Sequence, residues 1–132
     1  MKFLLDTDIC IYAMKGHTGV LSHLLARDGE EIAVSVITEA ELRTGAAKSS
    51  APIQTVKRVQ NFLRPLNVVE FTSEDAAIYA QVRGKLERAG TPIGPLDTLI
   101  AAQAVARKLT LITNNVREFR RISGLKVENW AG

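Results

Sequence analysis

Residues 3–12 read Phe-Leu-Leu-Asp-Thr-Asp-Ile-Cys-Ile-Tyr. The apolar run Phe3–Leu5 is typical of a short buried strand, and Asp6 ends it. From Asp8 to Met14 the apolar residues recur at helical spacing. This stretch therefore predicts a strand that passes directly into a helix, with acidic side chains at the junction.

The same alternation continues along the chain. Further strands are expected at 32–34, 68–69 and 109–112, with a fifth at 126–127. Helices are expected over 18–27, 37–48, 52–65, 73–90, 96–107 and 116–122, with Thr18 and Ser73 as caps. The pattern predicts one α/β domain over residues 1–132, with three layers (α/β/α) around a mostly parallel sheet of four to five short strands.

The composition is that of a globular protein. The chain is 46% hydrophobic and 23% charged, which excludes a disordered or collagen-like class. Its one cysteine, Cys10, excludes an intrachain disulfide and fits a reducing compartment. We see no secretory signal and no apolar run near the roughly 18 residues that cross a bilayer. A cytoplasmic protein without membrane association is therefore expected.

Basic residues outnumber acidic ones, 17 to 14, and they are clustered. Five of them lie between Leu42 and Val69 without any acid. A second group, from Arg107 to Arg121, contains only Glu118 as a counter-charge. This distribution permits a polyanionic partner, although most of these side chains are expected on solvated helix faces.

Acidic and amide side chains follow the ends of the predicted strands or open the neighbouring helices. They are Asp6, Glu41, Asp97, Asn114, Asn115 and Glu118. In a parallel sheet the carboxyl ends of the strands share one edge, where ligands gather. Helical spacing aligns Glu41 with Ile37 and turns Glu39 outward, and it aligns Asp97 with Ile100.

Carboxylates on inward faces are costly and repel one another unless a cation lies between them. Oxygen donors without nearby His or Cys favour Mg²⁺ or Mn²⁺ over zinc. The chemistry that this predicts is metal-activated attack of water on a phosphodiester.

Each candidate also has a structural explanation. Asp6 could cap a helix, Thr38-x-x-Glu41 matches a capping box, and Asp97 could stabilise a helix dipole. Three independent caps need not fall on inward faces at one edge, which favours the functional interpretation. His17 and His23 are expected to be surface or loop residues, and Trp130 a packing anchor.

Four segments resemble the PIN-domain family and, within it, the VapC toxins of toxin–antitoxin pairs. They are Phe3–Tyr12, Ser35–Gly45, Pro92–Ala102 and Leu111–Phe119, in family order and spacing. The resemblance implies an endoribonuclease dependent on Mg²⁺ or Mn²⁺ that arrests translation by cutting structured RNA such as tRNA. It puts Asp6, Glu41 and Asp97 on the family's metal-binding acids and Thr113 on its site-ordering threonine.

The resemblance also implies a homodimer and a VapB-type antitoxin, through which alone operator DNA would be contacted. Two positions depart from the family pattern. Asp8 replaces the usual asparagine, and Asn115 stands where a fourth acid is common, with Glu118 one helical turn later. We expect Glu118 rather than Asn115 to serve as the fourth acid, with Asn115 as the alternative metal ligand.

Two other functions fit parts of the sequence. A PIN-like RNA-binding module would result if the change at Asn115 abolished cleavage. A haloacid-dehalogenase-type phosphatase would use Asp6 as nucleophile and Asp8 as acid–base. Against the phosphatase, Ile9-Cys10 stands where such enzymes are expected to have Gly-Thr or Gly-Val, and the chain is short for that fold.

Overall fold

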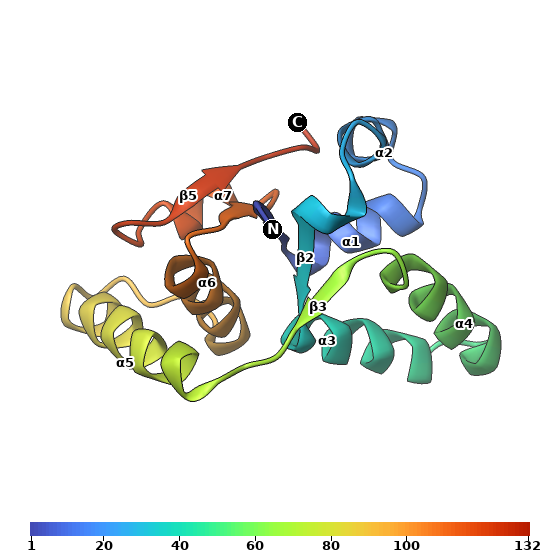
Figure 1. Ribbon diagram of the computed structural model, residues 1–132. Coiled ribbons are helices and arrows are strands. Elements are labelled where there is room, and N and C mark those ends of the chain that lie inside the picture. Colours follow the sequence, from blue (N-terminus) through green and yellow to red (C-terminus); the bar gives the residue numbers. More distant parts are fainter.

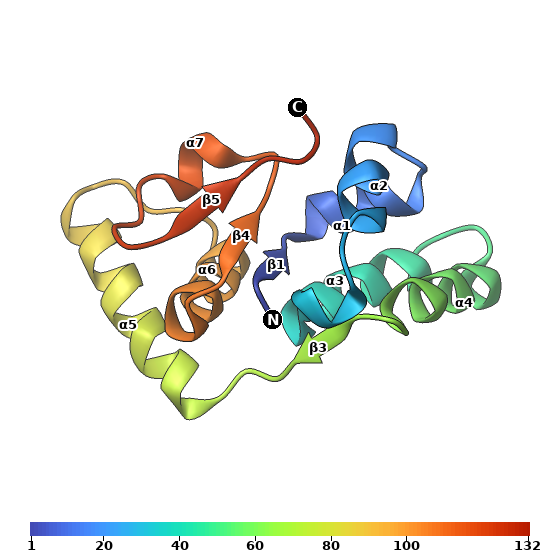
Figure 2. The same ribbon diagram turned by 45° about the horizontal axis from the view of Figure 1, so that its top comes forward.

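Five parallel strands form the centre of the molecule (Figures 1 and 2). The computed structural model describes residues 1–132. The strand order is β3-β2-β1-β4-β5. The strands are β1 (Phe3–Leu5), β2 (Ile32–Ser35), β3 (Asn67–Val69), β4 (Thr110–Ile112) and β5 (Lys126–Glu128). The expected parallel sheet is confirmed with all five strands, each within one or two residues of its predicted bounds.

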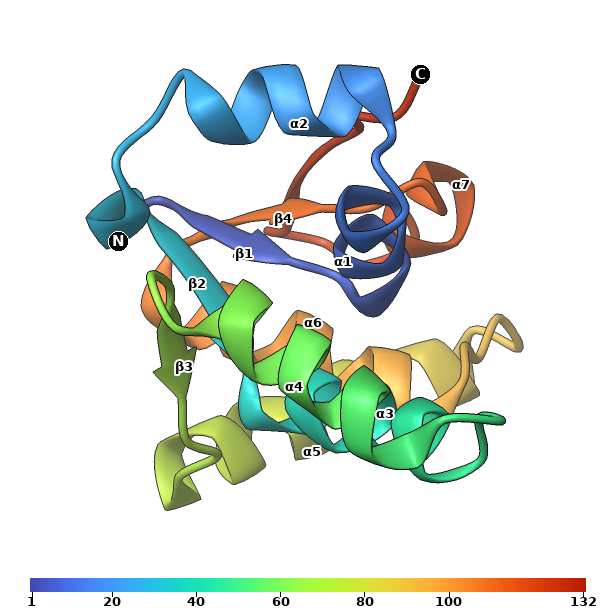
Figure 3. The same cartoon turned by 90° about the vertical axis from the view of Figure 1, so that its right-hand side faces the viewer.

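Helices cover both faces of this sheet. They are α1 (Thr7–Met14), α2 (Thr18–Leu25), α3 (Val36–Ala47), α4 (Pro52–Leu63), α5 (Ser73–Arg88), α6 (Pro95–Arg107) and α7 (Val116–Phe119), with a short 3₁₀ turn at Gly29–Glu31. Successive strand residues point to opposite faces. Leu5 accordingly joins the core under α1 to α4, and Leu4 joins the core under α5 to α7. Figure 3 shows α3 and α4 side by side on their face. The three-layer prediction is confirmed.

Two helix caps differ from the sequence prediction. Helix α2 is capped by His17, whose Nδ1 accepts the Val20 N–H at 3.2 Å, and it ends at Leu25. Helix α5 is capped by Thr72 in a capping box with Asp75. Thr18 and Ser73 are instead the first helical residues, because the side chain one position earlier already accepts the free N–H groups of the first turn.

Trp130 is a packing anchor, as predicted. Only 2% of its surface is exposed, and its ring lies 5.2 Å from that of Phe3 and 5.0 Å from that of His23. The Arg27 guanidinium covers the same indole at 4.6 Å. His23 is therefore half-buried in a stack. None of the seven helices combines the length and the apolar character that crossing a bilayer would require.

Candidate active site

Asp6 lies at the carboxyl end of the central strand and is held by two hydrogen bonds. Its Oδ1 accepts the N–H of Thr7 at 2.8 Å, so that Asp6 does cap α1. Its Oδ2 accepts the hydroxyl of Thr113, just after β4, also at 2.8 Å. The side chain is 5% exposed. The structural and functional interpretations of Asp6 therefore coexist, because one oxygen caps the helix while the other joins the neighbouring strand end.

The electrostatics of Asp6 show which groups surround it. Burial, and after it the charge of Asp8, raises the pKa of Asp6 to about 7, although the Thr113 and Thr7 hydrogen bonds oppose the rise. Asp97 adds a further raising contribution. No lysine or arginine forms an ion pair with Asp6. Asp6 is thus a nearly buried carboxyl among other carboxyls.

Glu41 reaches the same edge from α3. Its Oε1 accepts the hydroxyl of Thr7 at 2.8 Å, and that hydroxyl also lies 3.0 Å from the Thr38 hydroxyl. The capping-box interpretation of Thr38-x-x-Glu41 is wrong, because Ser35 caps α3. The neighbouring acid, Glu39, forms an ion pair with Arg43 at 2.7 Å on the outer face. Glu41 therefore reaches the sheet edge, as predicted, but not from the helix face that packs on the core, because the buried residues of α3 are Thr38, Leu42 and Ala46.

Asp97 lies in the first turn of α6, two residues after Pro95. Burial raises its pKa, and the charges of Glu41, Glu118 and Asp8 raise it further, in that order. Carboxylates from three other segments therefore lie close enough to Asp97 to act on it. Ile100, with which helical spacing aligns Asp97, is completely buried, and so are Ala101 and Ala104.

Asn115, the residue before α7, pairs with Glu118 on that helix. The Asn115 Nδ2 donates to Glu118 Oε2 at 2.9 Å, and the Asn115 N–H donates to the Thr113 hydroxyl at 3.0 Å. The two alternatives for the fourth position are therefore neighbours. Asn115 orients the Glu118 carboxylate, whose charge reaches Asp97.

Asp8 and Thr7 are also part of the site, although neither was predicted to be a metal ligand. Asp8 Oδ2 accepts the Asn114 N–H at 3.1 Å, while its Oδ1 is buried without a hydrogen-bond partner. Burial raises the pKa of Asp8. Thr7, which joins α1 to Glu41, was not among the candidates. Its position between two acids was the one local signal, and nothing in the sequence indicates that its hydroxyl would meet a helix 34 residues later.

The donor set suits a hard divalent cation. Asp6, Asp8, Glu41, Asp97 and Glu118 all lack a basic partner, and Asp8 Oδ1 is an unused buried acceptor. Burial raises the pKa of the Cys10 thiol well above its usual value, which makes it a poor ligand. No three His, Cys, Asp or Glu side chains converge as a preformed metal-binding group. An ion here would take few protein ligands and keep several waters, as Mg²⁺ commonly does.

Comparison with known proteins places this geometry in context. The model of the PIN domain family matches residues 3–125. The chain is 38% identical over 130 residues to the tRNA(fMet)-specific endonuclease VapC of Salmonella typhimurium, covering 98% of both chains. It is 40% identical over 133 residues to the ribonuclease VapC2 of Rickettsia felis, again covering 98% of both. It superimposes on a chain of the DNA-bound VapBC crystal structure from Salmonella typhimurium with a TM-score of 0.94, at 38% identity over 98% of each chain.

Proposed function

The chain belongs to the PIN-domain family and, within it, to the VapC ribonuclease toxins of VapBC toxin–antitoxin systems, and from this premise we propose that it is a metal-dependent endoribonuclease that cuts tRNA. The observation that carries the proposal is a group of carboxyls at one sheet edge without a basic partner, where burial and then the charges of neighbouring acids raise the pKa of Asp6 and of Asp97. Membership of this family sets aside the phosphatase alternative.

Asp6 and Asp97 are the proposed ligands of a Mg²⁺ or Mn²⁺ ion, with Glu41 and Glu118 as further acids and Asn115 as a neutral ligand. Such an ion supplies Lewis acidity and a water of lowered pKa for hydrolysis of a phosphodiester. Other side chains of the protein keep these acids in position through hydrogen bonds. Thr113 holds Asp6, and Thr7 holds Glu41.

The proposed substrate is structured RNA, with tRNA as the specific case. Two relatives that are 38% and 35% identical over almost the whole chain are named tRNA(fMet)-specific endonucleases. Cutting tRNA in the cytoplasm would arrest translation. The cationic excess of this chain is compatible with a polyanionic substrate.

The proposed partner is a VapB-type antitoxin that neutralises the ribonuclease. The solved relatives from Rickettsia felis and Salmonella typhimurium are VapBC structures with bound DNA. We propose that this chain contacts operator DNA only through such a complex, and that it forms a homodimer.

The proposal is tested by RNA cleavage with antitoxin-free protein, in EDTA and after addition of Mg²⁺. Glu41→Gln and Glu39→Gln form a matched pair, since the two acids lie on the same helix and only Glu41 contacts the site. Cleavage should require Mg²⁺ and should be lost in Glu41→Gln but retained in Glu39→Gln. Cleavage by wild-type protein in EDTA would contradict the metal dependence.

A catalytically weakened RNA-binding module remains the second candidate function, because Asn115 is neutral. It predicts that wild-type protein binds RNA but leaves it intact with Mg²⁺. Restoring a carboxylate by Asn115→Asp would then create cleavage. If the wild type cleaves RNA in Mg²⁺, the second candidate is wrong.

A further inference from the structure

A negatively charged edge cannot by itself attract a negatively charged RNA. Cations beside the acids must provide that attraction. The nearest cluster in sequence is on and after α7, where Arg117, Arg120 and Arg121 flank Glu118. All three arginines are exposed, and none forms an ion pair with a carboxylate.

This basic segment is firmly attached to the core. Phe119 is completely buried and Ile122 is 5% exposed, so the backbone that carries the arginines is fixed. Glu118 lies on the same helix and acts on Asp97. Positive charge therefore begins within one turn of the acid edge and continues along the chain to Arg121.

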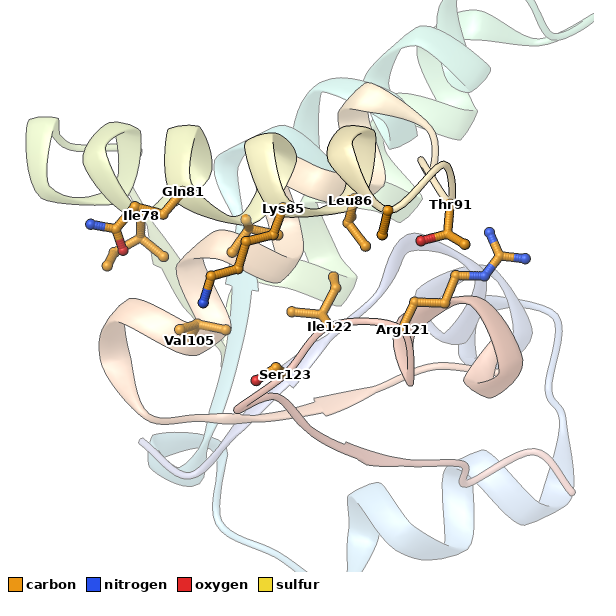
Figure 4. Close-up of a pocket in the computed structure, with 11 residues that line it drawn as sticks. Ile78, Gln81, Lys85, Leu86, Thr91, Val105, Arg121, Ile122 and Ser123 are labelled. Atoms are coloured by element: carbon orange, nitrogen blue, oxygen red, sulfur yellow. The ribbon is translucent and has the colours of Figure 1, made fainter.

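Beyond Arg121 lies a hollow of about 260 Å³ between α5 and the segment after α7 (Figure 4). Its apolar wall is formed chiefly by Ile78, Val82, Leu86, Val105 and Ile122. Lys85 and Arg121 bring charge to it, and in Figure 4 their charged ends lie on opposite sides of Ile122. Arg121 is steadied by a 3.3 Å hydrogen bond from its Nη1 to the carbonyl of Pro92. Lys85 has no carboxylate partner.

We propose that this hollow is an accessory RNA subsite, in which an unpaired nucleotide rests its base on the half-buried Val82 and Val105 while Lys85 and Arg121 bind the adjacent phosphates. An apolar wall can pack against the flat face of any base, and side-chain cations without a carboxylate partner can bind the phosphates of the RNA backbone. Gln81, Thr91 and Ser123 line the same hollow and offer hydrogen-bonding groups to a base edge. The inference rests on the proposed function, because it assumes that RNA occupies the acid edge.

The first test measures phosphate contacts by the salt dependence of binding. A fluorescent RNA hairpin with an unpaired loop is titrated with the Asp6→Asn protein, which is expected to bind without cutting. Adding Lys85→Gln and Arg121→Gln should lower the slope of log K against log salt by about 1.4–1.8, since each lost contact contributes about 0.7–0.9.

The matched control removes the same charge elsewhere. Lys57 and Arg64 are exposed on or just after α4, which lies on the other side of the molecule from α7 (Figures 1 and 2). Lys57→Gln with Arg64→Gln should leave the slope unchanged. If both pairs lower it equally, or neither does, the subsite is refuted.

The second test fills the hollow without changing charge. Ser123 is exposed, so Ser123→Trp should leave the fold intact, as a thermal melt would verify. Affinity for the looped hairpin should fall about fivefold or more, the smallest effect expected for one bound base, with an unchanged salt slope. A blunt RNA duplex should bind both proteins equally. Unchanged affinity for the hairpin would overturn the base-binding part.

These experiments separate the subsite from the proposed function. If Asp6→Asn protein binds RNA but is indifferent to the charges at the hollow, only the subsite fails. If that protein does not bind RNA at all, and the wild type does not cut it, the proposed function fails and the subsite with it.

Discussion

Two buried aspartates of this protein have opposite surroundings. Asp75 is 1% exposed, and its Oδ2 accepts both the Arg107 Nη2 and the Thr72 N–H at 2.8 Å. Asp6 is 5% exposed, but it has only two neutral donors and lies among other carboxyls. A buried acid that serves the fold receives a cation from the same chain. One left without a cation indicates a site for an external ion.

The largest expected effect on activity comes from replacing each of these two aspartates by asparagine. Asp6→Asn should reduce RNA cleavage about 10³-fold, the equivalent of the several kcal/mol that a metal ion contributes. Its melting temperature should not fall, because asparagine can still cap α1 and one repelling charge disappears. Asp75→Asn should melt earlier and still cut RNA. Equal activity losses in the two variants would remove the distinction between them.

The stability of the protein is expected to depend on pH through Asp6. The folded protein holds a proton on Asp6, whose pKa is about 7, over a range where the unfolded chain, with an ordinary value of 3.8, has lost it. The stabilisation from this proton is full below pH 3.8 and is lost as the pH rises to about 7. It amounts to at most about 4 kcal/mol, since each pKa unit is worth about 1.4 kcal/mol.

Urea unfolding of metal-free protein at pH 4, 6 and 8 measures this loss. In the Asp6→Asn variant, the free energy of unfolding should change less between pH 4 and pH 8 than in the wild type. Mg²⁺ should raise the stability of the wild type more at pH 8 than at pH 5, because only the carboxylate binds the ion. Superimposable profiles for the wild type and the variant would mean that Asp6 titrates normally.

On the structural side, Arg107→Met should destabilise the protein by about 3 kcal/mol, because Asp75 would keep a buried charge without its partner. The control is Arg83→Met, which breaks an exposed pair with Glu87 and should shift the urea midpoint far less. Urea midpoints compare the two. Folded Arg107→Met protein should cut RNA at close to the wild-type rate.

The fourth acid gives a smaller effect. Glu118→Gln should slow cleavage about tenfold, a loss of about 1.4 kcal/mol, because it removes a charge that acts on Asp97. Asn115→Ala should slow it less, since Glu118 would lose one orienting hydrogen bond. Initial cleavage rates at saturating Mg²⁺ compare the two variants. A larger loss of rate in Asn115→Ala than in Glu118→Gln would indicate that Asn115, rather than Glu118, is the ligand.

The smallest expected effect concerns the hydroxyl that positions Glu41. Thr7→Val should slow cleavage about fivefold, as expected for one hydrogen bond of about 1 kcal/mol. Thr44→Val is the control, because the Thr44 hydroxyl donates only to the Ala40 carbonyl of its own helix. Equal rates for the two variants would show that Thr7 does not act through Glu41.

Most of the secondary structure could be predicted because it depends on local periodicity. Phe3–Leu5 and the strand around Leu111 are short apolar runs, and Asp97 shares a helix face with the buried Ile100. The phase predicted for Glu41 was wrong, because the buried residues of α3 are Thr38, Leu42 and Ala46. The caps of α2 and α5 were wrong by one residue, because Thr72 was as acceptable locally as Ser73 and because the ring nitrogen of His17 acts as an acceptor in place of the Thr18 hydroxyl. Sequence alone could not choose between adjacent capping candidates.

The amino-acid sequence was enough to predict the succession of strands and helices along the chain, the acids that follow strand ends and the family. Which of the acids have partners depends on how the chain folds. Asp75 meets Arg107 across 32 residues, Glu41 meets Thr7 across 34, and Thr113 meets Asp6 across 107. The physical reason is that spacing along a chain sets the face a side chain occupies, whereas its contacts depend on how distant segments pack around the sheet.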